Sequence, residues 1–206
     1  MPSKPTRREI AEQDRYMVMQ QATFRRAADV IAADLAKLPE VRAVALFGSL
    51  VPPLAREVPR FASFRHHGIE IFHECKDIDL AIAIDRLDNL AALHRARSRA
   101  VVDLFKDSGI GVAHHQVDIF LFRDIWSDYL GRLCTYAQCP KGKVECLTPG
   151  CGREPLLKQH EGFVLEPGAL ALDRCVPLYE RGSTFLRRAS DLEATPLPSE
   201  PARRRS

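Results

Sequence analysis

Acidic residues inside two short apolar segments place the strongest constraint on how this chain can fold. In residues 75–84, Asp77 and Asp79 alternate with isoleucine and leucine, and Asp118 lies within a second alternating run at residues 115–122. Such alternation predicts β-strands, in which side chains two positions apart share a face. Asp77 and Asp79 are therefore expected to point the same way, and a neighbouring strand carrying Asp118 would add a third carboxylate.

This carboxylate cluster is suited to a divalent cation. Three converging carboxylates repel one another unless a cation lies between them, and hard oxygen ligands of this kind suit Mg²⁺ or Mn²⁺. The alternative interpretation is structural, because pairs of aspartates are also common on the solvated face of a sheet, where they need no function.

Upstream of the aspartates, residues 41–50 form an apolar strand pattern that runs directly into Gly48 and Ser49. A Gly-Ser pair that closes a strand exposes backbone N–H groups and a hydroxyl, which are groups that bind a triphosphate. Taken alone, the pair is also compatible with an ordinary turn.

The ordered combination of Gly48-Ser49, Asp77-x-Asp79 and a lone Asp118 resembles the nucleotidyltransferase superfamily that includes DNA polymerase beta. It is most similar to the small bacterial nucleotidyltransferase-domain proteins, and the resemblance covers residues 41–122.

The resemblance implies a function and a role for each motif. The activity would be transfer of a nucleoside monophosphate from an NTP to a hydroxyl acceptor, with release of pyrophosphate. Gly48 and Ser49 would hold the phosphates, and Asp77 and Asp79 would hold Mg²⁺. Asp118 would complete the metal site and help to activate the acceptor, which is a small molecule, a protein or an RNA.

The chain departs from the family pattern between these motifs. The family has a short connection there, whereas this chain has an insertion at residues 51–76 that is rich in proline, arginine and histidine. The insertion either contributes to the nucleotide pocket or covers it.

Composition and charge argue against several classes of protein. The chain has 206 residues, is 46% hydrophobic and carries a formal net charge of +3, much of which comes from the arginines at 203–205. This modest charge argues against a dedicated duplex binder. There is no apolar run of membrane-spanning length and no signal-peptide pattern, so we expect a cytoplasmic protein with no membrane partner and with reduced thiols.

Helices are predicted at residues 7–38, 89–106 and 124–133 from the spacing of apolar residues. A further strand is expected within residues 68–74. Prolines and arginines predict a disordered tail over residues 191–206.

Four cysteines cluster among turn-forming residues: Cys134, Cys139, Cys146 and Cys151. In a reducing compartment this cluster favours a structural Zn²⁺ site. Reactive or simply buried thiols and disulfides are the alternatives.

The predicted fold class is α/β, with a small mixed sheet, flanking helices and a zinc-ribbon-like C-terminal lobe. The predicted organisation is a nucleotidyltransferase-like domain at residues 1–133, a cysteine-rich lobe at 134–190 and the tail. The alternative function is a catalytically inactive interaction module. Such a module would bind a protein partner, as in a toxin–antitoxin pair, or RNA through the zinc lobe.

Overall fold

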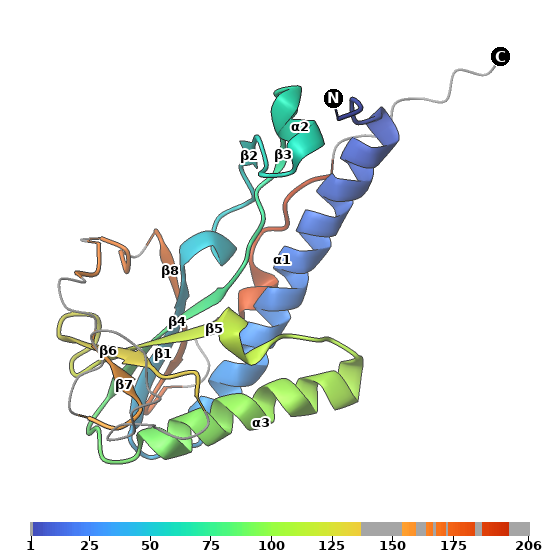
Figure 1. The fold of residues 1–206 in the computed structure, drawn as a ribbon. Coiled ribbons are helices and arrows are strands. Elements are labelled where there is room, and N and C mark those ends of the chain that lie inside the picture. The colour runs from blue at the N-terminus through green and yellow to red at the C-terminus, as the bar shows by residue number, and fades with distance from the viewer. Residues whose placement is uncertain are drawn as a thin grey trace, which may run out of the picture.

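A six-stranded mixed sheet with flanking helices forms the molecule (Figure 1). The structure, a computed structural model, describes residues 2–136, 154–159, 164–166, 168–171, 173–183 and 187–197. Its helices are α1 (Arg7–Leu35), α2 (Ala62–His66) and α3 (Leu90–Ser108). The main sheet contains β1 (Val41–Phe47), β4 (Ile78–Ile84), β5 (Val117–Phe122), β6 (Tyr129–Leu133), β7 (Leu157–Lys158) and β8 (Cys175–Glu180). The expected α/β class with a small mixed sheet is confirmed.

The strand order of the sheet is β7-β6-β5-β4-β1-β8. Strands β4 and β5 are parallel and are joined through α3, whereas β1 is antiparallel to both β4 and β8. Strands β7 and β8 come from residues 134–190, the segment predicted to be a separate lobe. These two strands therefore belong to the same sheet as the rest of the chain.

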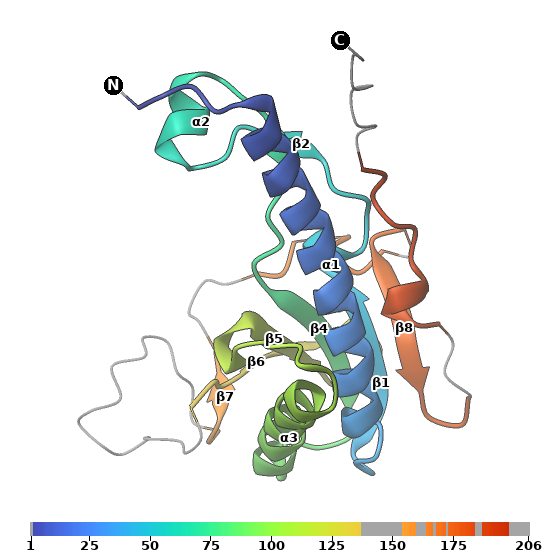
Figure 2. The same cartoon turned by 90° about the vertical axis from the view of Figure 1, so that its right-hand side faces the viewer.

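Helices α1 and α3 pack against one face of the sheet (Figures 1 and 2). The alternating apolar residues of β4 point to this side, together with those of β5. The opposite face carries a separate cluster around Phe47, Phe120 and Phe122. The sheet therefore has one face covered by helices and one face that is lined by aromatic side chains.

The ends of the two long helices follow local chemistry. Thr6 and Glu9 form a capping box at the start of α1, where the Glu9 amide donates to Thr6 Oγ1 at 3.2 Å. The helix ends at Leu35, before the predicted residue 38. Pro39 contributes to this early end, because a proline disfavours helical backbone at the residue before it. Gly109 ends α3 with a φ of 68°, a left-handed conformation that favours glycine.

The predicted helix over residues 124–133 is wrong, because residues 129–133 form β6, which pairs with β5. Trp126 has a φ of 65°, which interrupts a right-handed helix. Gly131 has a φ of 142° and lies so close to β7 that an added Cβ would be 2.6 Å from the Lys158 carbonyl oxygen. Sheet pairing has overridden the helical spacing of the apolar residues.

Residues 51–76 fold into a small unit beside the N-terminal half of α1 (Figure 2). Its elements are β2 (Arg56–Glu57), α2 and β3 (Ile71–Phe72), and the two strands pair with each other. Buried Asp14 of α1 accepts hydrogen bonds from Arg56 Nη2 at 2.7 Å and from the Phe72 amide at 2.9 Å. The insertion is thus fixed to α1 by a carboxylate.

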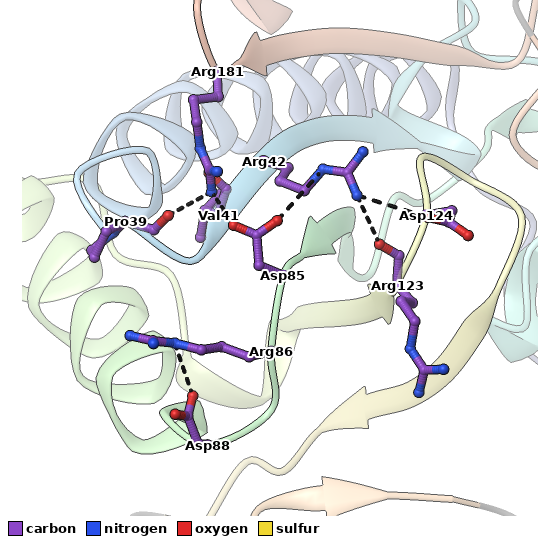
Figure 3. Close-up of polar contacts among 9 residues, drawn as sticks. All are labelled: Pro39, Val41, Arg42, Asp85, Arg86, Asp88, Arg123, Asp124 and Arg181. Carbon is purple, nitrogen blue, oxygen red and sulfur yellow. Dashed lines mark hydrogen bonds and ion pairs between the residues drawn. The ribbon is translucent and has the colours of Figure 1, made fainter.

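A polar network ties the strand ends at one edge of the sheet (Figure 3). Asp85, which follows β4, accepts from Arg181 Nη2 at 2.8 Å and lies 3.7 Å from Arg42 of β1. Arg42 also donates to the carbonyl of Arg123 at 3.3 Å. These groups are partly exposed, so each ion pair stabilises the fold only modestly.

In the described ranges, no helix combines the length and apolar character needed to cross a bilayer.

The segment from residue 187 to residue 197, which we call the C-terminal strap, packs against α1. It contains the short 3₁₀ turn η3 (Ala189–Asp191), whose first two amides donate to the Asp29 carboxylate of α1 at 2.6 and 3.1 Å. The predicted disordered tail is therefore wrong for residues 191–197. Residues 198–206 lie outside the described part of the chain.

Candidate functional site

Strand register brings the sequence-predicted site residues to one edge of the sheet. Phe47, the last residue of β1, is paired with Asp79 in β4, and Asp79 is paired with Asp118 in β5. Gly48 follows Phe47 at once, in the 3₁₀ turn η1 (Gly48–Leu50). Asp77 directly precedes β4. This edge lies opposite the Arg42–Asp85 network, because β1 and β4 are antiparallel.

Gly48 allows the chain to turn directly beside Asp79. Its φ is 78°, a conformation that side chains rarely adopt, and an added Cβ would lie 2.7 Å from Asp79 Oδ2. Glycine is thus required here twice over, by the backbone conformation and by the close approach to a carboxylate.

The carboxylates at this edge are electrostatically coupled. Burial, followed by the charges of Asp118 and Asp77, raises the pKa of Asp79 to about 6. Burial and Asp118 also raise the pKa of Asp77. Raised pKa values of this origin indicate a site where negative charge is under-compensated and where a cation would be stabilised.

Arg132 of β6 is a further candidate site residue, which the sequence patterns did not indicate. It forms an ion pair with Asp118 Oδ2, and its guanidinium lies over the Phe120 ring, 5.0 Å from the centroid. Its charge partly offsets the rise in pKa that burial and Asp118 cause at Asp77 and Asp79. No local signal identifies it, because its segment was predicted to be helical and the pairing with β5 depends on the fold.

Two hollows meet at Ser49 and Asp79, which line both of them. The first, which we call the insertion-side cavity, has a volume of about 400 Å³ and is also lined by Asp77 and by residues of the insertion, including Arg60 and Lys76. The insertion therefore forms a wall of this cavity and leaves it accessible. The second hollow lies on the aromatic face of the sheet.

Hydrogen bonds from Arg25 of α1 connect the turn that follows β1 to α1 and to the C-terminal strap. Buried Arg25 of α1 donates to the carbonyls of Leu50 at 2.8 Å, Val51 at 3.1 Å and Glu193 at 2.9 Å. The thiol of Cys75 donates to the Ser49 carbonyl at 3.5 Å. Because the carbonyl groups of the turn face these donors, the turn is anchored independently of any ligand.

The acidic edge fits an open magnesium site better than a closed one. Among the described residues, no group of three or more histidine, cysteine, aspartate or glutamate side chains is arranged to hold a metal ion. The expected metal cluster of Asp77, Asp79 and Asp118 is thus not preassembled. Asp118 forms an ion pair with Arg132 instead. Mg²⁺ is usually bound by one or two carboxylates plus substrate phosphates, so Asp77 and Asp79 with their raised pKa values fit this ion.

The predicted zinc site falls mostly outside the described residues. Cys139, Cys146 and Cys151 belong to the part of the chain that the structure does not describe. Cys134 follows β6 and is a buried free thiol. The zinc site stays a prediction.

Comparison with known proteins identifies no relative. No family model, no curated protein and no solved structure matches the chain.

Proposed function

We propose that the protein is a metal-dependent nucleotidyltransferase that moves a nucleoside monophosphate from an NTP to a hydroxyl acceptor. The observation that carries the proposal is the convergence of the Gly48 turn with Asp77, Asp79 and Asp118 at one edge of the sheet. The coupled pKa values of Asp77 and Asp79 support it.

The insertion-side cavity is the site that suits the NTP. Ser49 and its neighbouring turn lie at one end of it, and Asp77 and Asp79 line it. Arg60 and Lys76 supply positive charge for the phosphates, and a bound metal ion would offset the carboxylates of the same lining, which belong to Glu57, Glu74, Asp77 and Asp79. Because Arg25 anchors the turn through its carbonyls, the turn keeps its position when the phosphates bind.

The transfer step is an in-line displacement at the α-phosphorus. The acceptor oxygen forms a bond to phosphorus while the bond to the β-phosphate oxygen breaks, and pyrophosphate leaves with that electron pair. The proton of the acceptor hydroxyl passes to the carboxylate of Asp118, which lies beside Asp79. Catalysis of this kind depends on positioning and charge stabilisation.

Asp77 and Asp79 are the residues that would hold Mg²⁺ or Mn²⁺. The ion would supply charge neutralisation on the triphosphate and on the leaving pyrophosphate. Arg132 would hold the Asp118 carboxylate in position through their ion pair.

Isothermal titration of each NTP with Mg²⁺ tests the proposal, with wild type compared against Asp79→Asn. We expect saturable binding by wild type that weakens at least about tenfold in the variant, because a charged phosphate–metal contact is lost. Asp107→Asn is the matched control, since this exposed aspartate lies on α3, away from the site. Equal binding by Asp79→Asn and wild type contradicts the proposal.

Zinc content measured on the same sample tests the predicted cysteine site.

The alternative is an inactive interaction module built on the same scaffold. The ion pair between Arg132 and Asp118 favours it, because a carboxylate neutralised by arginine has less need of a metal ion. Nucleotide binding separates the two functions: an interaction module binds no NTP, with or without Mg²⁺, while keeping its fold.

A further inference from the structure

Two adjacent hollows lie on the aromatic face of the sheet, and the larger one reaches the carboxylate edge. Their volumes are about 710 and 490 Å³, and residues 164–166 line both of them. The larger hollow is lined by Ser49 and Asp79, and the smaller one is lined by Trp126. We call this pair of hollows the open-face groove.

The floor of the open-face groove is aromatic. Phe47 and Phe120 pack edge to face with their ring centroids 5.0 Å apart, and Phe122 packs against Trp126 at 5.9 Å. Leu165 lines both hollows from the other side. Concave sites with an apolar floor and a few polar groups at one end are typical of small-molecule binding.

The charged groups around the larger hollow of the open-face groove are mostly acidic. Glu166 and Asp173 line it together with Asp79, and Arg174 is the cation among the described lining residues. The insertion-side cavity is also mostly acidic, and its charged lining consists of Glu57, Arg60, Glu74, Lys76, Asp77 and Asp79. The open-face groove differs from it by its aromatic floor, and its acidic lining disfavours an anionic ligand that no metal ion accompanies.

We infer that the open-face groove is the acceptor site, and that the acceptor is a small hydroxyl compound with an aromatic or apolar body and no negative charge. The assignment rests on the proposed function, because it divides the donor and the acceptor between the two hollows. The hydroxyl of the acceptor lies at the Ser49–Asp79 end. Its oxygen forms the bond to the α-phosphorus, its proton passes to Asp118, and pyrophosphate leaves on the insertion side.

A nucleic-acid end fits this groove poorly. An oligonucleotide would bring its phosphates against Asp79, Glu166 and Asp173, and like charges that face each other across an interface weaken binding. The aromatic floor alone would accept a base, so charge is the property that decides between the two kinds of acceptor.

The test uses three probes that share a phenylpropyl skeleton and differ in charge. L-phenylalaninol is cationic, 3-phenyl-1-propanol is neutral and 3-phenyllactate is anionic; each carries an aliphatic hydroxyl. Binding to the protein without nucleotide is measured by saturation-transfer NMR, and a short oligo(A) is included. We expect the cation and the neutral alcohol to bind and to compete with each other, and the anion and oligo(A) to bind at least about tenfold more weakly. Equal binding of the anion or of oligo(A), or no binding by any probe, overturns the inference.

Surface variants identify the groups responsible. Glu166→Gln with Asp173→Asn removes two exposed carboxylates and should reduce the preference for the cation over the anion by about tenfold, with unchanged affinity for the neutral alcohol. Asp107→Asn should leave all three affinities unchanged. An unchanged preference in the double variant would exclude the acidic rim as its source and overturn the inference.

The acceptor role has its own measurement. Incubation of the neutral alcohol with NTP and Mg²⁺ should give a product heavier by one nucleoside monophosphate, seen by mass spectrometry. If the NTP binds and the alcohol binds but no such product forms, the acceptor assignment is wrong. If no NTP binds, the proposed function fails and the acceptor role falls with it, while binding of the alcohol still assigns the groove as a small-molecule site.

Discussion

At the scale of single residues, Gly48 is the position where the backbone and the site constrain each other most. We expect Gly48→Ala to lower the free energy of unfolding by about 2 kcal/mol, from left-handed backbone strain and from the clash with Asp79 Oδ2. Gly68→Ala is the matched control, because its φ is 59° but an added Cβ meets nothing within 4 Å. Urea unfolding of the two variants separates the two costs, and equal losses would show that the approach to Asp79 is unimportant.

The raised pKa of Asp79 predicts how stability depends on pH. Because burial, Asp118 and Asp77 raise this pKa to about 6, the folded protein binds a proton at Asp79 more tightly than the unfolded chain does. The resulting stabilisation is fully present below the ordinary carboxyl range and is lost as the pH rises through about 6. In metal-free protein, Asp79→Asn should therefore be more stable than wild type by about 2 kcal/mol near neutral pH, with the difference shrinking toward about pH 4. A constant difference across that range would contradict the assignment.

Arg132 predicts competition between an internal cation and a metal ion. With Asp118 released from its ion pair, we expect Arg132→Met to bind Mn²⁺ about tenfold more tightly, although the metal-free protein should be less stable. Arg132→Lys keeps the charge and should stay near the wild-type affinity. Calorimetric titration with Mn²⁺ measures both variants, and weaker binding by Arg132→Met would mean that the guanidinium supports the ion.

At the scale of elements, the C-terminal strap holds the segment that follows β1. Thr195 is buried; its Oγ1 accepts from the Leu54 amide at 2.8 Å and donates to Gln21 Oε1 at 3.2 Å. Thr195→Val leaves both partners unsatisfied, so we expect a loss of about 2 kcal/mol in unfolding free energy. Hydrogen exchange of the Leu54 amide should accelerate as well. Ser190→Ala, an exposed change in the same strap, should do neither; exchange at Leu54 that stays as slow as in wild type would show that the strap is dispensable.

The elements also show how far sequence patterns reach. Period-two alternation predicted β4 and β5, and apolar spacing predicted α1 and α3, because each of these elements buries one regular face. The same spacing gave a helix at 124–133, where pairing with β5 and the backbone of Gly131 impose a strand. The strap was missed because its composition resembles disordered segments, whereas its order comes from distant partners on α1 such as Arg25.

The candidate site divides in the same way. Gly48, Asp77, Asp79 and Asp118 are visible in the sequence because each lies in or beside a strand with a strong local pattern. Arg132 and Arg25 are not, because their roles depend on strand order and on a contact between segments that lie far apart in the chain. The sequence therefore indicates the carboxylates and the glycine turn of the candidate site, but it does not indicate the arginines that contact them.

At the scale of the whole molecule, the proposed donor and acceptor sites lie on the two sides of one acidic edge. Anomalous diffraction from crystals soaked with Mn²⁺ and a non-hydrolysable NTP analogue tests this arrangement most directly. We expect a Mn²⁺ peak at Asp77 and Asp79, with the triphosphate beside Ser49 in the insertion-side cavity and the open-face groove free for an acceptor. A triphosphate bound elsewhere, or no Mn²⁺ at these carboxylates when the analogue is bound, would contradict it.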